Sequence, residues 1–350
     1  MNHKYIFLLS WCLVLLSGAA FAGNPDRQGE EGAKQLLINP WARSAGLHSM
    51  NTSMVSGTDA LFLNVAGLAR INKMQIQLGH TRYLDGADIN LNALGFAQRV
   101  GKGGAFGISL VSFDLGDFDL TTTDTPEGSG ATFSPSYFNL GLSYSHLFPN
   151  HVSVGIMAKF VNESIPNAGA HAIALDAGVQ YVTGAKDNFK FGISLRNVGG
   201  KMRYTGEGLS TSNDSKNDVF QYPITYYQRS AEYELPSQLN IGASYDWLFG
   251  RASRLTLLGN FTSNAFSRDQ LGGGLEFALN QNFALRAGYK MEFEAPQGSK
   301  EASLDNGISA GLSVSLPLRK GTDNRLSLDY GYRYTSIFNG IHNLGIRIDL

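Results

Sequence analysis

The sequence predicts an all-β transmembrane protein: a closed barrel of about 14 antiparallel strands with a small N-terminal plug. Three observations lead to this fold class. Only 16% of the 350 residues are charged, whereas soluble domains carry about 25%. Apolar residues alternate with small or polar ones from residue 73 onward. The chain also begins with a secretory leader, which places the mature protein outside the cytoplasm.

The overall charge argues against nucleic acid as a partner. The chain has 28 Lys and Arg against 29 Asp and Glu, and its formal net charge is -1. Nucleic-acid-binding domains have a basic excess that neutralises phosphates, and this sequence has none. Because so little of the surface is charged, we expect much of it to contact outer-membrane lipid.

Residues 1–22 are predicted to be a signal peptide. Lys4 supplies the positive start, residues 6–16 are apolar, and Ala20 and Ala22 flank a small-x-small cleavage site. The apolar stretch is shorter than the roughly 20 residues that a membrane-spanning helix needs, so cleavage is favoured over an uncleaved anchor. The mature protein is then expected to start near Gly23 and to reside in the outer membrane. The single cysteine, Cys12, lies in the leader, which excludes disulfides and thiol chemistry from the mature chain.

Residues 23–72 are predicted to form a polar lead-in and a compact plug. Apolar residues between positions 33 and 71 occur in helix-like clusters, and Gly46, Gly57 and Gly67 interrupt them. The regular alternation starts only after this region. The remaining residues, 73–350, are therefore assigned to the barrel.

The strands are predicted from apolar residues at every second position. In residues 152–160, for example, Val, Ile, Ala and Phe alternate with Ser, Gly, Met and Lys. Each segment is close to the 9 to 11 residues of a tilted membrane strand. A soluble sandwich would also alternate, but it would surround its buried faces with more charge. The segments begin near Met74, Ile89, Gly104, Phe138, Val152, His171, Phe189, Leu239, Leu255, Leu271, Phe283, Ile308, Leu326 and His342.

The connections between these strands alternate in length. Short turns are expected at residues 101–103, 148–150, 184–188, 249–254, 280–282 and 317–324. Longer polar loops are expected at residues 114–135, 162–170, 198–236, 263–270 and 294–306. Outer-membrane barrels place short turns in the periplasm and long loops outside the cell. The alternation of short and long connections therefore favours a membrane barrel over a soluble sandwich.

The last strand resembles an assembly signal of outer-membrane barrels. Gly345, Ile348 and Leu350 match a polar-x-Gly-x-x-apolar-x-apolar pattern, with Leu350 where an aromatic residue is more common. This resemblance implies recognition by the barrel assembly machinery.

Two stretches of the plug region carry a family resemblance. Residues 35–47 read QLLINPWARSAGL and residues 57–69 read GTDALFLNVAGLA. They resemble the plug of PorV/PorQ proteins, which belong to the wider FadL-like barrels. In the wider group Thr58 would be a second acid and Val65 a proline, so the turn before the first strand is expected to differ here. Residues 235–245 resemble a strand start of the same families. The plug-motif residues are Arg43, Ser44, Gly46, Asp59, Asn64 and Gly67.

The resemblance implies a role in protein secretion. PorV and PorQ proteins serve the type IX secretion system, and PorV-like members receive exported cargo that carries a C-terminal targeting domain. The loops at residues 114–135 and 198–236 would then contact translocon subunits or cargo. FadL-like relatives instead pass small hydrophobic compounds through a lateral opening, and this transport role is the alternative. A purely structural barrel is a third hypothesis.

No catalytic or cofactor site is predicted. The acidic residues Asp114, Asp117 and Asp119 lack the 12-residue spacing of a calcium loop. The glycine-rich residues 101–104 and 272–274 do not lead into helices, so they are interpreted as turns and wall bends rather than phosphate loops. The seven histidines show no metal-ligand spacing. The protein is therefore expected not to be an enzyme and to need no cofactor or metal.

Charged residues on the polar faces of the strands are candidates for the barrel lumen. They could line a solute path or hold the plug by ion pairs, and the sequence leaves both open. These residues are Lys159, Arg196, Arg286, Lys290, Asp329, Arg333 and Arg347. Tyr330, Tyr332 and Tyr334 are interpreted as lipid-facing aromatics rather than as a ladder for ligand stacking.

Overall fold

The computed structural model describes residues 27–122, 124–214, 222–250, 253–280, 282–293, 306–319, 324–336 and 338–350. The predicted signal peptide, residues 1–22, lies outside these ranges. No helix among the described residues has the length and apolar character needed to cross a membrane.

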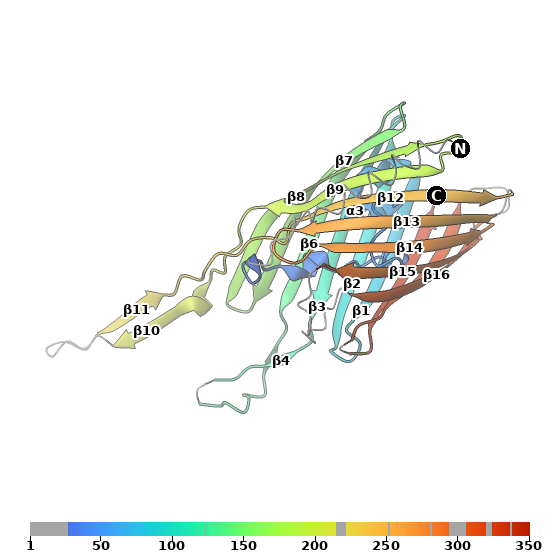
Figure 1. Ribbon diagram of the computed structural model, residues 1–350. Coiled ribbons are helices and arrows are strands. Elements are labelled where there is room, and N and C mark those ends of the chain that lie inside the picture. The colour runs from blue at the N-terminus through green and yellow to red at the C-terminus, as the bar shows by residue number, and fades with distance from the viewer. Residues whose placement is uncertain are drawn as a thin grey trace.

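Within the described residues, fourteen strands pair antiparallel with their neighbours and close into a barrel (Figure 1). The barrel closes where β1 pairs with β18, from Gln75 opposite Asp349 to Arg82 opposite His342. This confirms the predicted fold class. The strands are β1 (Met74–Tyr83), β2 (Ile89–Val100), β3 (Gly104–Asp114), β6 (Ser136–Leu147), β7 (Val152–Ile165), β8 (Ala168–Thr183), β9 (Phe189–Gly199), β12 (Gln238–Phe249), β13 (Ser253–Asn264), β14 (Gln270–Leu279), β15 (Phe283–Glu292), β16 (Gly307–Pro317), β17 (Arg325–Arg333) and β18 (Ile341–Asp349).

The two faces of the wall differ as the alternation predicts. On β7, the outward Ile156 side chain is 62% exposed, whereas Lys159 on the inward face is only 6% exposed. On β8, Ile173 faces outward and Gln180 faces inward. A closed barrel pairs its backbone amides and carbonyls between strands, so the outward face can enter hydrocarbon without unpaired polar groups.

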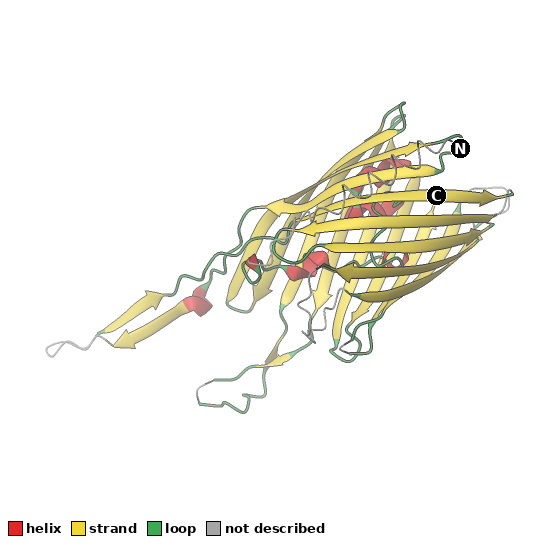
Figure 2. Cartoon of the chain, in the orientation of Figure 1, coloured by secondary structure: helices red, strands yellow, loops and turns green. Residues whose placement is uncertain are grey.

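The plug consists of short helices inside the barrel (Figure 2). Its helical segments are η2 (Lys34–Leu37), α2 (Ala42–Ala45), η3 (Gly57–Asp59), α3 (Ala60–Leu63) and η4 (Val65–Arg70). Glycines let the plug approach the wall. A Cβ atom on Gly155 of β7 would lie 2.6 Å from the carbonyl carbon of Val65, and one on Gly46 would lie 2.7 Å from the Cα of Gly311 on β16. The buried core of the protein is therefore the interface between plug and wall.

Two hairpins extend from the end of the barrel opposite the short turns (Figure 1). One pairs β4 (Phe118–Asp119) with β5 (Thr132–Phe133). The other, which we call the outer arm, pairs β10 (Ser210–Asp214) with β11 (Pro223–Tyr227) and follows η5 (Glu207–Leu209). Both hairpins lie in loops that the sequence predicts to face outside the cell.

The sequence predicts a long loop at residues 162–170, and this prediction is wrong. β7 continues to Ile165 and β8 begins at Ala168, so residues 166 and 167 form a tight turn. The two strands are longer than predicted because they pack against a loop. Val161 and Ala170 are buried against Met202 from the β9–β12 connection. That packing joins residues far apart in sequence, so local polarity did not indicate it.

Candidate functional site

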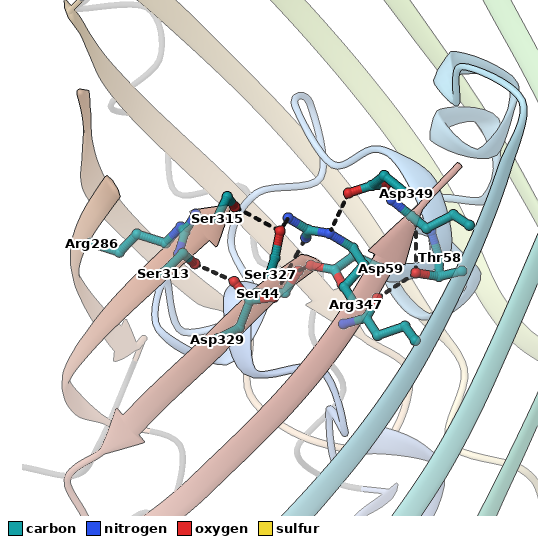
Figure 3. A network of polar contacts seen from close by, with 12 residues as sticks. Ser44, Thr58, Asp59, Arg286, Ser313, Ser315, Ser327, Asp329, Arg347 and Asp349 are labelled. Atoms are coloured by element: carbon teal, nitrogen blue, oxygen red, sulfur yellow. Dashed lines mark hydrogen bonds and ion pairs between the residues drawn. The ribbon is translucent and has the colours of Figure 1, made fainter. Parts of the chain in front are cut away.

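The plug is bonded to the wall at the seam where the barrel closes (Figure 3). The backbone N–H of Thr58 donates to Oε1 of Gln75 on β1 at 2.5 Å, and the Thr58 hydroxyl donates to the same atom at 2.8 Å. The Gln75 side-chain amide in turn donates to Asp349 on β18. Within the plug, the Ser44 hydroxyl donates to Asp59 at 3.0 Å. The same group of bonds therefore ties together the plug and both strands of the seam.

A charged network continues from the seam across the last strands (Figure 3). Arg347 on β18 lies 3.6 Å from the carboxylate of Asp329 on β17. The hydroxyl of Ser313 on β16 donates to Asp329 and accepts from Arg286 on β15 at 2.5 Å. Arg286 also pairs with Glu276 on β14 at 2.7 Å. Three of the predicted lumen charges, Arg286, Asp329 and Arg347, thus belong to one network.

The other predicted lumen charges lie elsewhere along the wall. Lys159 forms an ion pair with Asp176 at 2.8 Å. Arg196 donates to the carbonyl oxygen of Leu36 in the plug at 3.2 Å, and its guanidinium lies 4.0 Å from the centre of the Phe62 ring. Lys290 and Arg333 are partly buried on β15 and β17. Contacts with the plug and contacts within the wall therefore both occur among these residues.

Several plug-motif residues hold the plug in place. The Asn64 side chain donates to the carbonyl oxygens of Thr52 and Val179, each at 3.1 Å, and accepts from the N–H of Ala66 at the start of η4. Gly67 leaves room for the carbonyl group of Val55, which a Cβ atom would strike. These contacts, with those of Ser44, Asp59 and Gly46, explain why small and polar residues stand at these positions.

Arg43, the remaining motif residue, faces open space at the short-turn end of the lumen. Two cavities of about 410 and 420 Å³ share Arg43, Leu248 and Arg254, and we call them together the vestibule. Charged residues line both cavities. The first is lined by Arg43, Arg254, Arg286, Arg347 and Glu276, and the second by Arg43, Arg70, Lys186, Lys190, Arg254, Asp187 and Asp246.

At the opposite end, Glu163 on β7 joins the N-terminal segment to the base of the outer arm. Its carboxylate accepts from the Gln35 amide at 2.6 Å, from the Tyr204 hydroxyl at 2.7 Å and from the Tyr233 hydroxyl at 2.8 Å. Burial, followed by the hydrogen bond to Glu163, raises the pKa of both tyrosines far above the usual value for phenols. Both hydroxyls therefore remain protonated donors. We call this group the Glu163 junction.

The first described residues are also held at this outer end. Gly32 donates its N–H to the carbonyl oxygen of Glu234 at 3.0 Å. The guanidinium of Arg27 lies 3.3 Å from the Glu234 carboxylate and 4.4 Å from the centre of the Phe266 ring. Glu234 and Phe266 come from the β9–β12 and β13–β14 connections. The chain therefore runs through the lumen from the outer loops to the start of β1 at the other end.

Sequence reasoning did not single out the Glu163 junction. A usable signal was present, because Glu163 has the same parity as the inward-facing Lys159 on its strand. Its partners were not predictable, because Gln35 and Tyr233 lie 128 and 70 residues away in the chain.

The hairpins present aromatic side chains to solvent. On and beside β11, Tyr222, Tyr226 and Tyr227 are each more than half exposed. On the β4–β5 hairpin, Phe118 stacks on Phe133 with ring centres 5.8 Å apart. Exposed tyrosines supply large contact areas with few rotatable bonds and are common in binding surfaces. The outer end thus has the composition of a recognition surface.

The cavity beside Trp41, between the plug and the wall in the outer half, is small. In the described part of the chain, the cavity between the plug residue Trp41 and Met157 of β7 has a volume of about 20 Å³, room for about one water molecule. The wall has a bulge where Asp176 on β8 stands opposite two residues of β9 and accepts the N–H of Asn197 at 2.7 Å. Strand pairing continues on both sides of it.

Other sequence features are local. Asp114 accepts the N–H of Gly116 in a turn, and Ser134 donates to Asp117. Tyr330 and Tyr334 lie on the outward face of the wall. Among the residues that the structure describes, no three His, Cys, Asp or Glu side chains come together in a way that could hold a metal ion.

Comparisons with known proteins identify one family. The family model described as "Type IX secretion system protein PorV" matches residues 26–267. No curated protein matches the chain in sequence.

Solved structures with a similar fold are outer-membrane barrels. A FadL homologue of Pseudomonas aeruginosa has a TM-score of 0.54 at 12% identity, covering 89% of this chain and 98% of that one. The Pseudomonas putida toluene transporter TodX has a TM-score of 0.52 at 13% identity, with coverages of 88% and 96%. The toluene transporter TbuX of Ralstonia pickettii has a TM-score of 0.50 at 13% identity, with coverages of 91% and 98%. At these identities the likeness shows the fold alone.

Proposed function

The chain belongs to the PorV family of type IX secretion system proteins, and we propose that its outer end is a receiving platform for exported cargo or translocon subunits. It is an outer-membrane β-barrel component of this secretion system. The platform consists of the outer arm, the β4–β5 hairpin and the N-terminal segment from Arg27 to Leu37.

The observation that carries the proposal is the combination of a plug in the outer half of the lumen with an aromatic outer surface. Trp41 and Phe62 occupy the outer half of the lumen, beside a cavity of only about 20 Å³. The tyrosines of the outer arm and the phenylalanines of the hairpin are exposed outside the wall. Such an arrangement favours binding over conduction. We propose no catalytic role, and we expect the barrel assembly machinery to insert the protein after a cleaved signal peptide has directed its export.

The Glu163 junction supports the proposal, because it fixes the base of the outer arm. Tyr204 precedes the arm and Tyr233 follows it, and both bind the same carboxylate on the wall. A binding surface loses less conformational entropy on association when its base is already fixed. The geometry therefore favours an arm that is held ready for a partner.

The alternative, transport of small hydrophobic compounds, has less support. Two of the structures with a similar fold are described as toluene transporters. A hydrophobic solute needs an apolar cavity of about 300 Å³ or more, whereas the cavity beside Trp41 and Phe62 in the outer half of this lumen has a volume of about 20 Å³. The strand pairing around the bulge at Asp176 is continuous. We therefore retain the secretion role.

Partner capture from native membranes tests the proposal. The tagged full-length protein is cross-linked in intact cells and recovered beside a variant in which Tyr222, Tyr226 and Tyr227 are serine. We expect a secretion-system subunit or exported cargo with the wild type and a clearly lower yield with the variant. A variant with Thr211 and Ser212 changed to alanine on β10 is the matched control. Recovery of neither class of partner with the wild type would contradict the proposal.

A further inference from the structure

The vestibule at the short-turn end is strongly basic. Among the described residues, seven basic side chains line its two cavities, against three acidic ones. The barrel wall around it is a low-dielectric shell, and such walls concentrate the electric field of the charges inside. The vestibule is therefore attractive to anions. Short turns of outer-membrane barrels lie in the periplasm, so the vestibule opens toward that compartment.

Most of its cations are neutralised by neighbours in the wall. Arg286 pairs with Glu276 at 2.7 Å and Lys190 with Asp246 at 2.6 Å. Arg43 differs, because its guanidinium makes no hydrogen bond and no ion pair within the described ranges, although it lines both cavities. A guanidinium carries five N–H donors in a planar fork that matches a carboxylate. Glu276 and Asp59 attract this guanidinium, but neither carboxylate contacts it directly. A partly buried cation with no direct ion pair gains further stabilisation when a ligand brings a counter-charge into contact with it.

The size and the neutral lining of the vestibule narrow the class of ligand. Each cavity lies within the range of about 300 to 1,000 Å³ that is typical of ligand sites. Ser253 and Asn282 add hydroxyl and amide groups near the opening, and Leu248 adds apolar surface. Such a mixture suits a peptide, whose backbone needs hydrogen bonds and whose carboxylates need cations. The wall separates this space from lipid headgroups.

We propose that the vestibule binds an acidic peptide segment that enters from the periplasm and places a carboxylate on Arg43. This inference goes beyond the receiving role of the outer end and does not depend on it. The site faces the opposite side of the membrane, and the plug separates the two. The barrel would thus contact a periplasmic partner as well as partners outside the cell.

Binding to the purified full-length protein in detergent tests the proposal. The probe is a fluorescently labelled hexapeptide of alternating Asp and Glu, and its neutral counterpart contains Asn and Gln. We expect the acidic peptide to bind, with an affinity that falls as salt is raised. Arg43→Gln should weaken binding about tenfold or more, because a charge-assisted fork is lost. Lys102→Gln removes the same charge from an exposed turn at the same end but outside the vestibule, and it should bind as the wild type does.

A second variant keeps the test independent of the Arg43 change. Ala278→Trp fills the first cavity without removing a polar group, and it should also weaken binding. Equal affinity for the acidic and neutral peptides would overturn the proposal. So would unchanged binding in folded Arg43→Gln and Ala278→Trp proteins, or an affinity for inorganic phosphate alone. Because no cargo or translocon subunit is present, the result is independent of the outer platform.

Discussion

The backbone N–H of Thr58 in the plug donates to the side-chain oxygen of Gln75 on β1 at 2.5 Å, and Gln75 donates to Asp349 on β18. One glutamine therefore links three parts of the chain: the plug, the first barrel strand and the last. All three residues lie where the barrel closes, so the bond that seats the plug also reinforces the seam.

Gln75→Leu should destabilise the folded barrel by about 1–3 kcal/mol, because it leaves the buried N–H of Thr58 without an acceptor at similar side-chain volume. Urea unfolding in lipid vesicles, followed by tryptophan fluorescence, measures the change. Asn92→Leu is the control, since it removes an amide whose hydrogen bond is to His80 on the exposed face of the wall, away from the plug. If both variants unfold at the same urea concentration as the wild type, the plug contact at Gln75 contributes no stability.

Gly155→Ala should disturb the seating of the plug, because the new methyl group would lie 2.6 Å from backbone atoms of Val65. Overpacking of this kind costs about 1–3 kcal/mol. The midpoint temperature at which the folded band is lost on semi-native gels reports the effect. Gly259→Ala provides a matched change, because its nearest neighbour would be 3.9 Å away. Equal midpoints for the two variants would show that β7 does not contact η4 closely.

Tyr233→Phe should loosen the base of the outer arm, because it removes one hydrogen bond to Glu163 and keeps the ring. We expect faster amide exchange in residues 200–207 and 228–236, with the barrel strands unchanged, as measured by hydrogen–deuterium exchange and mass spectrometry. Tyr226→Phe alters an exposed hydroxyl of the arm and should leave exchange unchanged. Identical exchange in both variants would mean that the Glu163 junction does not restrain the arm.

Ile156→Arg should impair insertion, because it places a charge on the outward face near the middle of β7. Charged residues on the lipid face near the bilayer midplane cost about 2–4 kcal/mol. The yield of folded protein in vesicles of fixed composition measures the loss. Thr125→Arg adds the same charge in the exposed β4–β5 hairpin and should fold at the wild-type yield. Normal yield for Ile156→Arg would contradict a lipid-facing position.

The wall could be predicted closely from sequence, because each strand carries its own evidence. The alternation in residues 152–160 and 326–334 predicts which face of each strand contacts lipid, and the structure has strands β7 and β17 in these two segments. The prediction of a long loop between β7 and β8 was wrong, because apolar residues of these strands pack on Met202, which belongs to another loop. Local patterns do not reveal partners that come from distant segments.

The sites were harder to predict for the same reason. Arg43 could be named as part of a motif, but its place in the vestibule and its lack of a direct ion pair depend on strands from β8 to β18. Glu163 has an unremarkable local sequence, and its importance comes from Gln35, Tyr204 and Tyr233, which three separate segments supply. The local sequence specifies each strand, whereas the sites form where segments that are distant in the sequence come into contact.

The path of the plug has a consequence for biogenesis. The segment near Arg27 is held among the outer loops, and the chain must pass through the lumen before β1 begins at the opposite rim. If the barrel closed first, the N-terminal segment would afterwards have to pass through the closed lumen. Wrapping the sheet around an already docked N-terminal region avoids that step, which makes zippering of β1 onto β18 the final event. That last pairing unites the first and last strands of the barrel, which are far apart in the sequence, and such contacts are the slowest for a chain to form.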